Sequence, residues 1–195
     1  VVEGKVVTRV HYMDLLGDTS TVIDYEQVTS AFTGNKGTDE WGDWFVVYQD
    51  VELAERPSFE AKSSLIVYDG ATLTCNKGIE VPRAGSLTIY AQKDQSGAIV
   101  ADARFLGATA GIGSSDGRTA GEITINGAHV QAAGGKEGAG IGCGGNQAAN
   151  LHDNVSGPFT LNRGNVSASG GWKGAGVGHG LANYDGSGSD RTVTT

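Results

Sequence analysis

The chain contains a block of residues that repeats itself without a gap. The first copy, at residues 123–144, reads ITINGAHVQAAGGKEGAGIGCG, and the second, at residues 159–180, reads FTLNRGNVSASGGWKGAGVGHG. The offset is a constant 36 residues, and half of the aligned positions are identical. A repeat in constant register predicts one supersecondary unit that stacks on its own copy. Any fold proposed for this chain must therefore bring equivalent residues of the two copies together.

Apolar and polar residues alternate within each copy, as in Ile123-Thr124-Ile125 and its counterpart Phe159-Thr160-Leu161. Alternation with a period of two predicts short strands with one buried face. Glycines recur between these strands, and glycine allows the positive φ and the close backbone approach that tight corners need. One unit is therefore predicted to hold three short strands, ITI, HVQA and GIG. This pattern predicts an all-β chain folded as a parallel β-helix, with about three short strands per coil.

The repeat also predicts which side chains are stacked. Val130 and Val166 are expected to point inward and to lie one above the other. Asn126 lies over Asn162 in the same register, which suggests either an amide ladder or a turn that simply favours Asn. A hairpin stack with Asn126-Gly127 as its turn is a rival interpretation. Weaker copies of the repeat lie upstream. Leu87 precedes Ile123 by 36 residues, and a Gly-Ile-Gly segment at residues 111–113 precedes the one at residues 140–142 by 29 residues.

The N-terminal part of the chain differs in composition from the repeats, because it carries most of the large side chains. Residues 1–40 are interpreted as an N-terminal cap or a small separate β element, and residues 41–195 as the β-helix. Strands are predicted at residues 5–12, 21–25 and 44–48, the last because β-branched and aromatic residues cluster there. The strand-like residues 191–195 predict that the array continues beyond Thr195, since an exposed end would be a pairing liability.

Composition limits the possible partners. The chain has 14 basic and 22 acidic residues, so its net charge is −8. This balance disfavours nucleic acid and anionic membrane surfaces as partners. No apolar stretch approaches the roughly 20 residues that span a bilayer, so no membrane insertion is predicted. The 32 glycines follow no Gly-X-Y period, which excludes collagen.

The two cysteines, Cys75 and Cys143, are predicted to be free and buried or half-buried thiols, although a disulfide remains open. Two cysteines also disfavour a zinc site. The histidines show no metal-ligand spacing, and no cofactor is predicted.

The strings GAGIG(x)G, ITING and VxAxGG together resemble a repeat of large surface proteins of gut bacteria that are often described as adhesin-like or carbohydrate-binding. The matching segments are 109–113, 121–132, 134–145 and 160–180, and the resemblance covers roughly residues 38–195. It implies a right-handed parallel β-helix (β-solenoid), within an extracellular, cell-surface attached protein with flanking domains. No catalytic motif is carried over by this resemblance.

Parallel β-helices also carry pectinases and related polysaccharide enzymes, and Gly178-His179-Gly180 is similar to the Gly-His-Gly of polygalacturonases. The accompanying Asn-Thr-Asp, Asp-Asp and Arg-Ile-Lys motifs do not occur in this chain. The few acidic residues of the repeats do not recur on one strand face, whereas inverting hydrolysis needs two facing carboxyl groups. The chain is therefore predicted not to be an enzyme. A polysaccharide-active enzyme, either a glycosidase or a lyase, is the alternative.

Positions that differ between the two copies are the candidates for a ligand site. Trp172 replaces Lys136 at a corner, and His179 replaces Cys143. Exposed aromatic rings stack on sugar faces, so Trp172, Tyr184 and His179 are the predicted ligand-binding residues; Trp41 and Trp44 are further aromatic candidates.

Asp185 and Asp190 flank a Gly- and Ser-rich loop that suits calcium, with a plain solvated loop as the alternative. The predicted function is a non-catalytic bacterial surface module for adhesion or glycan binding, with a glycan or host surface as partner, or a rigid stalk.

Overall fold

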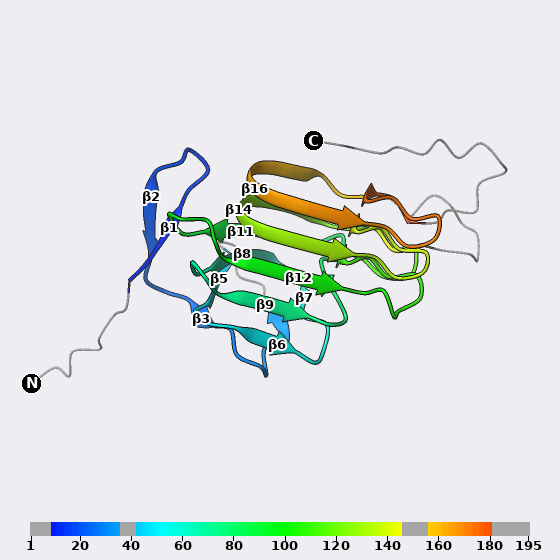
Figure 1. Ribbon diagram of the computed structural model, residues 1–195, viewed down its shortest axis with the longest axis horizontal. Coiled ribbons are helices and arrows are strands. Elements are labelled where there is room, and N and C mark those ends of the chain that lie inside the picture. Colours follow the sequence, from blue (N-terminus) through cyan, green and yellow to red (C-terminus); the bar gives the residue numbers. More distant parts are fainter. Residues whose placement is uncertain (1–8, 36–41, 146–155, 181–195) are drawn as a thin grey trace, which may run out of the picture.

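The computed structural model describes residues 9–35, 42–145 and 156–180 of the chain. These residues form β-strands and no helix. Strands β1 (Val10–Met13) and β2 (Thr19–Val22) form an antiparallel hairpin. The other described strands pair in parallel and form two sheets, one of nine strands and one of six (Figure 1).

The nine-stranded sheet runs in the order β3-β5-β8-β11-β14-β12-β9-β6, and β16 pairs with β14. Its two longest strands, β14 and β16, contain the first parts of the two repeat copies. β14 joins the two halves of the sheet, because it pairs with both β11 and β12, and β16 pairs along β14. Its strands are β3 (Glu26–Gln27), β5 (Asp43–Val47), β6 (Val51–Leu53), β8 (Lys62–Val67), β9 (Thr72–Cys75), β11 (Ser86–Ala91), β12 (Ala98–Asp102), β14 (Glu122–Ala133) and β16 (Phe159–Ser169).

The six-stranded sheet consists of strands of two residues each, in the order β17-β15-β13-β10-β7-β4. Its strands are β4 (Gly34–Asn35), β7 (Ser58–Phe59), β10 (Ile79–Glu80), β13 (Ile112–Gly113), β15 (Ile141–Gly142) and β17 (Val177–Gly178). The chain alternates between the two sheets, so each of these short strands follows a strand of the larger sheet.

The hydrophobic core lies between the two sheets. In β11 the side chains of Leu87 and Ile89 are buried and those between them are half-buried, as the alternating sequence predicts. Ile112 and Ile141 of the short strands enter the same core. Burial of each such aliphatic side chain contributes about 1.5–3 kcal/mol, so the core is the main source of stability.

Several strand pairs expected from the repeat are present. Ile123 pairs with Phe159 and Leu87 pairs with Ile123, each at the 36-residue offset. Val130 pairs with Val166; Val130 is buried and Val166 is half-buried against the core. The predicted inward stacking of these two valines is therefore confirmed.

The predicted right-handed parallel β-helix with about three short strands per coil is wrong. The described strands form one curled nine-stranded sheet and one sheet of two-residue strands, beside an antiparallel hairpin. The predicted corner between ITI and HVQA does not end the strand, because Gly127 and Ala128 adopt positive φ of 136° and 72° and form an irregularity inside β14. ITI and HVQA consequently belong to one strand of 12 residues, Glu122–Ala133.

The Asn ladder and the Asn-Gly hairpin are also not formed. The irregularity shifts the register by one residue, so that Asn126 pairs with Arg163 instead of Asn162. The side-chain amide of Asn126 donates a hydrogen bond to the backbone oxygen of Met13, at 2.9 Å. Arg163 donates to the backbone oxygens of Asp14 and Leu15, so both side chains hold the hairpin rather than each other.

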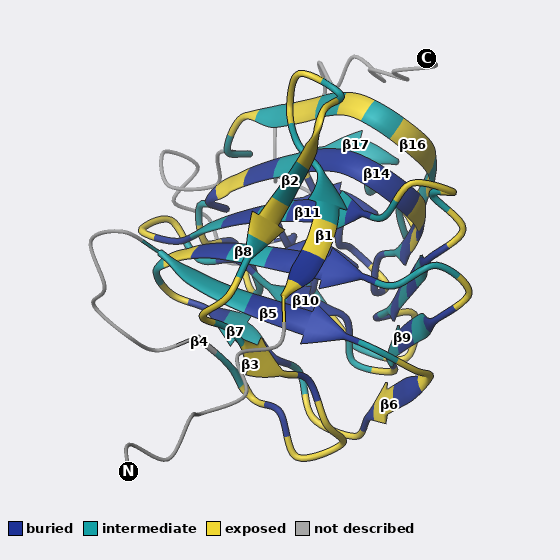
Figure 2. Ribbon diagram, turned by 90° about the vertical axis from the view of Figure 1, so that its left-hand side faces the viewer, coloured by how far each residue is buried: buried dark blue, intermediate teal, exposed yellow. Residues whose placement is uncertain are grey.

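The β1–β2 hairpin lies across one face of the larger sheet (Figure 2). Figure 2 shows β1 and β2 crossing the outer face of the nine-stranded sheet. Val10 packs there with Val46 and Ile66, whose side chains point away from the main core, and Tyr12 contacts the rings of Trp44 and Tyr90. Residues 26–35 supply β3 and β4 to the two sheets, and the division at residue 40 stays a prediction.

We expect Val130→Asp to destabilise the fold severely, because it buries a charge without a partner. Val166→Asp is expected to cost less, since Val166 is only half-buried. Thermal melts of both variants test this order. Equal melting temperatures for Val130→Asp and the unmodified chain would contradict the placement of Val130 in the core.

Candidate functional site

Three β-turns follow strands β12, β14 and β16 and lie one above the other at the carboxyl ends of these strands (Figure 1). The turns are closed by backbone hydrogen bonds from Leu106 to Ala103, from Gly138 to Gly135 and from Gly174 to Gly171, of 2.8–3.0 Å. We call residues 103–106, 135–138 and 171–174 the turn stack.

Backbone hydrogen bonds also join the turns to one another. The amide of Lys136 donates to the oxygen of Leu106 at 3.1 Å, and the amide of Gly171 donates to the oxygen of Gly138 at 2.9 Å. A Cβ at Gly171 would overlap the carbonyl oxygen of Gly135, so the third turn lies directly against the second. The backbone of the turn stack is therefore fixed, while five of the six central residues are exposed and Glu137 is buried.

The turn stack carries two large aromatic side chains that are mostly exposed. Trp172 is 61% exposed and Phe105 is 91% exposed. Trp172 was predicted as a ligand-binding residue, and the structure places it on the surface as expected. Phe105 was not predicted, because it lies in a connection two residues longer than those after β14 and β16 and so has no counterpart in the repeat. Phe105 also continues the apolar alternation of Ile99, Ala101 and Ala103, so the sequence pattern favours a buried position for it rather than an exposed one.

Cationic side chains occupy the same turns. The ammonium group of Lys173 lies 4.4 Å from the centroid of the Trp172 ring, which is a cation–π contact. Lys136 is exposed in the turn between Phe105 and Trp172. Arg104 forms a two-pronged ion pair with Asp102, whose pKa these hydrogen bonds hold below its usual value.

The other aromatic and acidic candidates do not join this surface. Trp44 packs beneath the hairpin, where its ring stacks on Tyr90 with centroids 5.4 Å apart, so it is not a surface platform. Tyr184, the calcium candidates Asp185 and Asp190, and Trp41 all lie outside the described residues.

His179 follows β17 and is separate from the turn stack. Its Nδ1 lies 3.6 Å from Sγ of Cys143, the residue one repeat earlier. His179 is exposed, as expected for a position that tolerates change, but Cys143 is completely buried. The two equivalent positions therefore differ in burial. The prediction of two free, buried thiols is confirmed for Cys75 and Cys143.

The Cys143–His179 contact lacks the surroundings of a nucleophilic centre. A nucleophile needs an open face toward its substrate and free N–H donors for the developing oxyanion. Sγ of Cys143 is enclosed by Ser156 and the Gly178 carbonyl, at 3.8 Å each. The amide of Cys143 already donates to Gly178, and that of Gly144 to Ser114.

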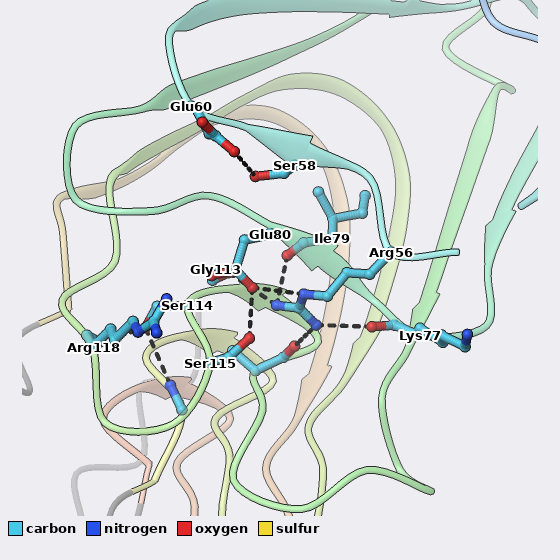
Figure 3. A network of polar contacts seen from close by, with 12 residues as sticks. Arg56, Ser58, Glu60, Lys77, Ile79, Glu80, Gly113, Ser114, Ser115 and Arg118 are labelled. Atoms are coloured by element: carbon cyan, nitrogen blue, oxygen red, sulfur yellow. Dashed lines mark hydrogen bonds and ion pairs between the residues drawn. The ribbon is translucent and has the colours of Figure 1, made fainter. Parts of the chain in front are cut away.

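Figure 3 shows a second polar cluster, centred on the guanidinium group of Arg56. Its Nε donates to Oε2 of Glu80 at 2.8 Å, and the same oxygen accepts from the hydroxyl of Ser115 at 2.6 Å. The remaining guanidinium nitrogens donate to backbone oxygens at 2.8–3.0 Å. These oxygens belong to Lys77, Ile79, Ala110 and Gly113.

This cluster is structural rather than a ligand site. Every guanidinium nitrogen of Arg56 donates to a protein acceptor, so none is left for a ligand. The acceptors belong to connections and short strands on either side of β10 and β13, which Arg56 therefore holds together. Burial lowers the pKa of Arg56, and the nearby Glu80 opposes this shift.

Taken together, the residues in the described ranges assemble no catalytic constellation, and no group of three or more His, Cys, Asp or Glu side chains among them is arranged to hold a metal ion. Within the same ranges, no helix is long and apolar enough to cross a membrane. Comparisons with protein families, with curated proteins and with solved structures found no match to this chain. The turn stack is therefore assigned as the candidate site from its own geometry.

We expect Arg56→Met to lower the free energy of unfolding by about 3 kcal/mol, because it removes the five hydrogen bonds of the guanidinium group and leaves the carboxylate of Glu80 without its ion-pair partner. Urea unfolding of the variant measures this loss. Lys77→Ala is the matched control: it removes the exposed Lys77–Glu55 ion pair, which should contribute at most about 1 kcal/mol. Equal effects of the two substitutions would contradict the role given to Arg56.

Cys75 is expected to resist thiol reagents in the folded protein. Burial raises the pKa of its thiol to about 12, so almost no reactive thiolate forms at mildly alkaline pH. Labelling is measured in a Cys143→Ser variant, so that Cys75 is the cysteine that reacts. Serine is chosen because Ser114 occupies the position equivalent to Cys143 after the neighbouring strand β13. Cys75 should react only after unfolding in urea; rapid labelling of the native protein would contradict its burial.

Proposed function

We propose that this chain is a non-catalytic module of a bacterial cell-surface protein that binds glycans through the turn stack. The observation that carries the proposal is the exposure of two large aromatic rings, Phe105 and Trp172, on turns of one stack. Exposed apolar side chains that gather on one surface, rather than lie scattered singly, indicate a binding surface.

The chemistry of these turns suits a sugar. The C–H face of a pyranose ring packs on the electron-rich face of an aromatic ring, while its hydroxyl groups stay hydrated. The backbone of the turns is already fixed by hydrogen bonds within and between them. Binding would therefore order little besides the side chains of Phe105 and Trp172, which reduces its entropic cost.

The extracellular, surface-attached setting and the role in adhesion are supported by the resemblance of the GAGIG(x)G and ITING segments to bacterial surface repeats. In such a protein, flanking domains of the same polypeptide would supply attachment to the cell. The partner in this proposal is a glycan of a host or dietary surface. The fully engaged Arg56–Glu80 cluster and the enclosed Cys143 give no support to the alternative of a polysaccharide-active enzyme.

We expect Trp172→Ala to weaken glycan binding about tenfold or more, because loss of one stacked ring removes about 1.4 kcal/mol of binding free energy. An array that includes mucin and plant polysaccharides identifies a bound glycan, and calorimetry with that glycan compares the variants. Trp172→Tyr should retain most of the affinity. All variants should keep the melting temperature of the unmodified chain, since Trp172 is exposed.

Leu16→Ala is the matched control for loss of an exposed apolar side chain. Leu16 is 86% exposed at the tip of the β1–β2 hairpin, at the opposite end of the strands from the turn stack (Figure 1). This variant should bind as the unmodified chain does. The proposal would be rejected if the folded chain bound no glycan, or if Leu16→Ala and Trp172→Ala weakened binding equally.

A further inference from the structure

The charges on the turn stack differ from those of the whole chain. Residues 98–180 carry equal numbers of basic and acidic side chains, so the net charge of −8 arises elsewhere. The basic residues are Arg104, Arg118, Lys136, Arg163 and Lys173, and the acidic residues are Asp102, Asp116, Glu122, Glu137 and Asp153. The aromatic surface thus belongs to the least acidic part of the chain.

Within the turn stack itself, the exposed charge is positive. Asp102 is occupied by Arg104, to which it is bound through both of its oxygens. Glu137, the acidic residue of the central turn, is only 5% exposed. Lys136 and Lys173 are exposed and take no part in the ion pairs formed between described residues. Two exposed ammonium groups therefore remain beside the aromatic rings.

These cations and rings lie on the same or neighbouring turns of the stack. Lys136 and Trp172 occupy equivalent positions of neighbouring turns, which are stacked at about the 4.8 Å spacing of paired strands. Lys173 holds its ammonium group over the Trp172 ring while remaining exposed. A ligand that stacks on the opposite face of Trp172, or displaces Lys173 from the ring, would thus meet one positive charge next to the ring and another one turn away.

We infer that the ligand of the turn stack is an acidic polysaccharide, one that carries carboxylate or sulfate groups on its sugar rings. This inference rests on the proposed glycan binding and adds the class of glycan. A neutral sugar would use the rings but would give the two ammonium groups no anionic partner. An acidic sugar would satisfy both, because its ring stacks on Trp172 while its anionic groups pair with Lys136 and Lys173.

A single-stranded nucleic acid also combines anionic groups with rings that stack, but the structure favours it less. Such ligands carry a phosphate at every nucleotide and are held by long basic grooves. Two lysines and one paired arginine are few for that purpose, and the net charge of −8 would repel a dense polyanion. A polysaccharide has its charges on the sugar rings themselves, which matches neighbouring lysine and tryptophan side chains.

The test compares acidic polysaccharides with neutral polymers of the same backbone. Polygalacturonate carries a carboxylate on each sugar, which its methyl ester replaces with a neutral ester group, and dextran sulfate differs from dextran in the sulfate groups. Binding of the full chain is measured by biolayer interferometry. At least one acidic polymer should bind about tenfold more tightly than its neutral counterpart. Binding should weaken between about 50 and about 300 mM NaCl, because the charges lie at the surface.

The double variant Lys136→Glu/Lys173→Glu should lose about tenfold or more in affinity for that acidic polymer. The control Lys62→Glu/Lys93→Glu changes the net charge by the same amount at exposed lysines outside the turn stack and should lose much less. Equal losses in the two variants would show that overall charge, not the turn stack, attracts the polymer, and would overturn the inference.

The remaining outcomes separate this inference from the proposed function. Equal binding of acidic and neutral polymers, still weakened by Trp172→Ala, would overturn the preference for acidic sugars and leave glycan binding in place. Absence of binding to every polysaccharide, including those of the array, would overturn both. Tighter binding of polyuridylate than of any acidic polysaccharide would also overturn the inference and assign the surface to nucleic acid.

Discussion

The close approach of neighbouring backbones at the six-stranded sheet is the constraint on which the fold depends. Gly113, Gly142 and Gly178 pair with one another at the ends of their short strands, with φ of 136°, 132° and 129°. A Cβ at Gly113 would overlap the carbonyl oxygen of Gly142, and one at Gly142 would overlap that of Gly178. Only glycine meets both the conformation and the spacing, so the Gly-Ile-Gly segments recur because the chain must turn back there without a side chain.

Glu80 ends this column of glycines. It pairs with Gly113, but it has a side chain and does not have positive φ. Its carboxylate is held by Arg56, which also binds carbonyl oxygens before and within the neighbouring strands. Where the glycine column stops, the guanidinium group of Arg56 therefore adds to the backbone hydrogen bonds that join β10 and β13. Because these contacts join residues up to 57 positions apart, one side chain links three successive passes of the chain.

The sequence predicted strands and strand pairs that follow from local apolar periodicity. It did not predict features that depend on contacts between distant residues. The alternating residues of 123–125 and 159–161 predicted their strands and their pairing, because a one-residue slip would expose the core face. The pattern did not show that Gly127 and Ala128 would continue the strand, which is why the three-strand β-helix was wrong. Arg56 and the hairpin across the sheet gave no local signal either. At the candidate site, the exchange of Lys136 for Trp172 between repeat copies indicated Trp172, whereas Phe105 had no copy for comparison.

The backbone hydrogen bonds of the turn stack explain why a ligand site would lie there. Positions that differ between the copies, such as Lys136 and Trp172, point outward from turns whose closing hydrogen bonds involve only the backbone. A change of side chain there leaves the glycines, the core and the register untouched. Gly135 and Gly171 in the same turns have no such freedom, since a Cβ at either would strike the carbonyl oxygen of an adjacent turn. Each turn therefore combines a glycine that cannot be replaced with a neighbouring position that accepts different side chains. Substitutions at the second kind of position can create a binding site without destabilising the fold.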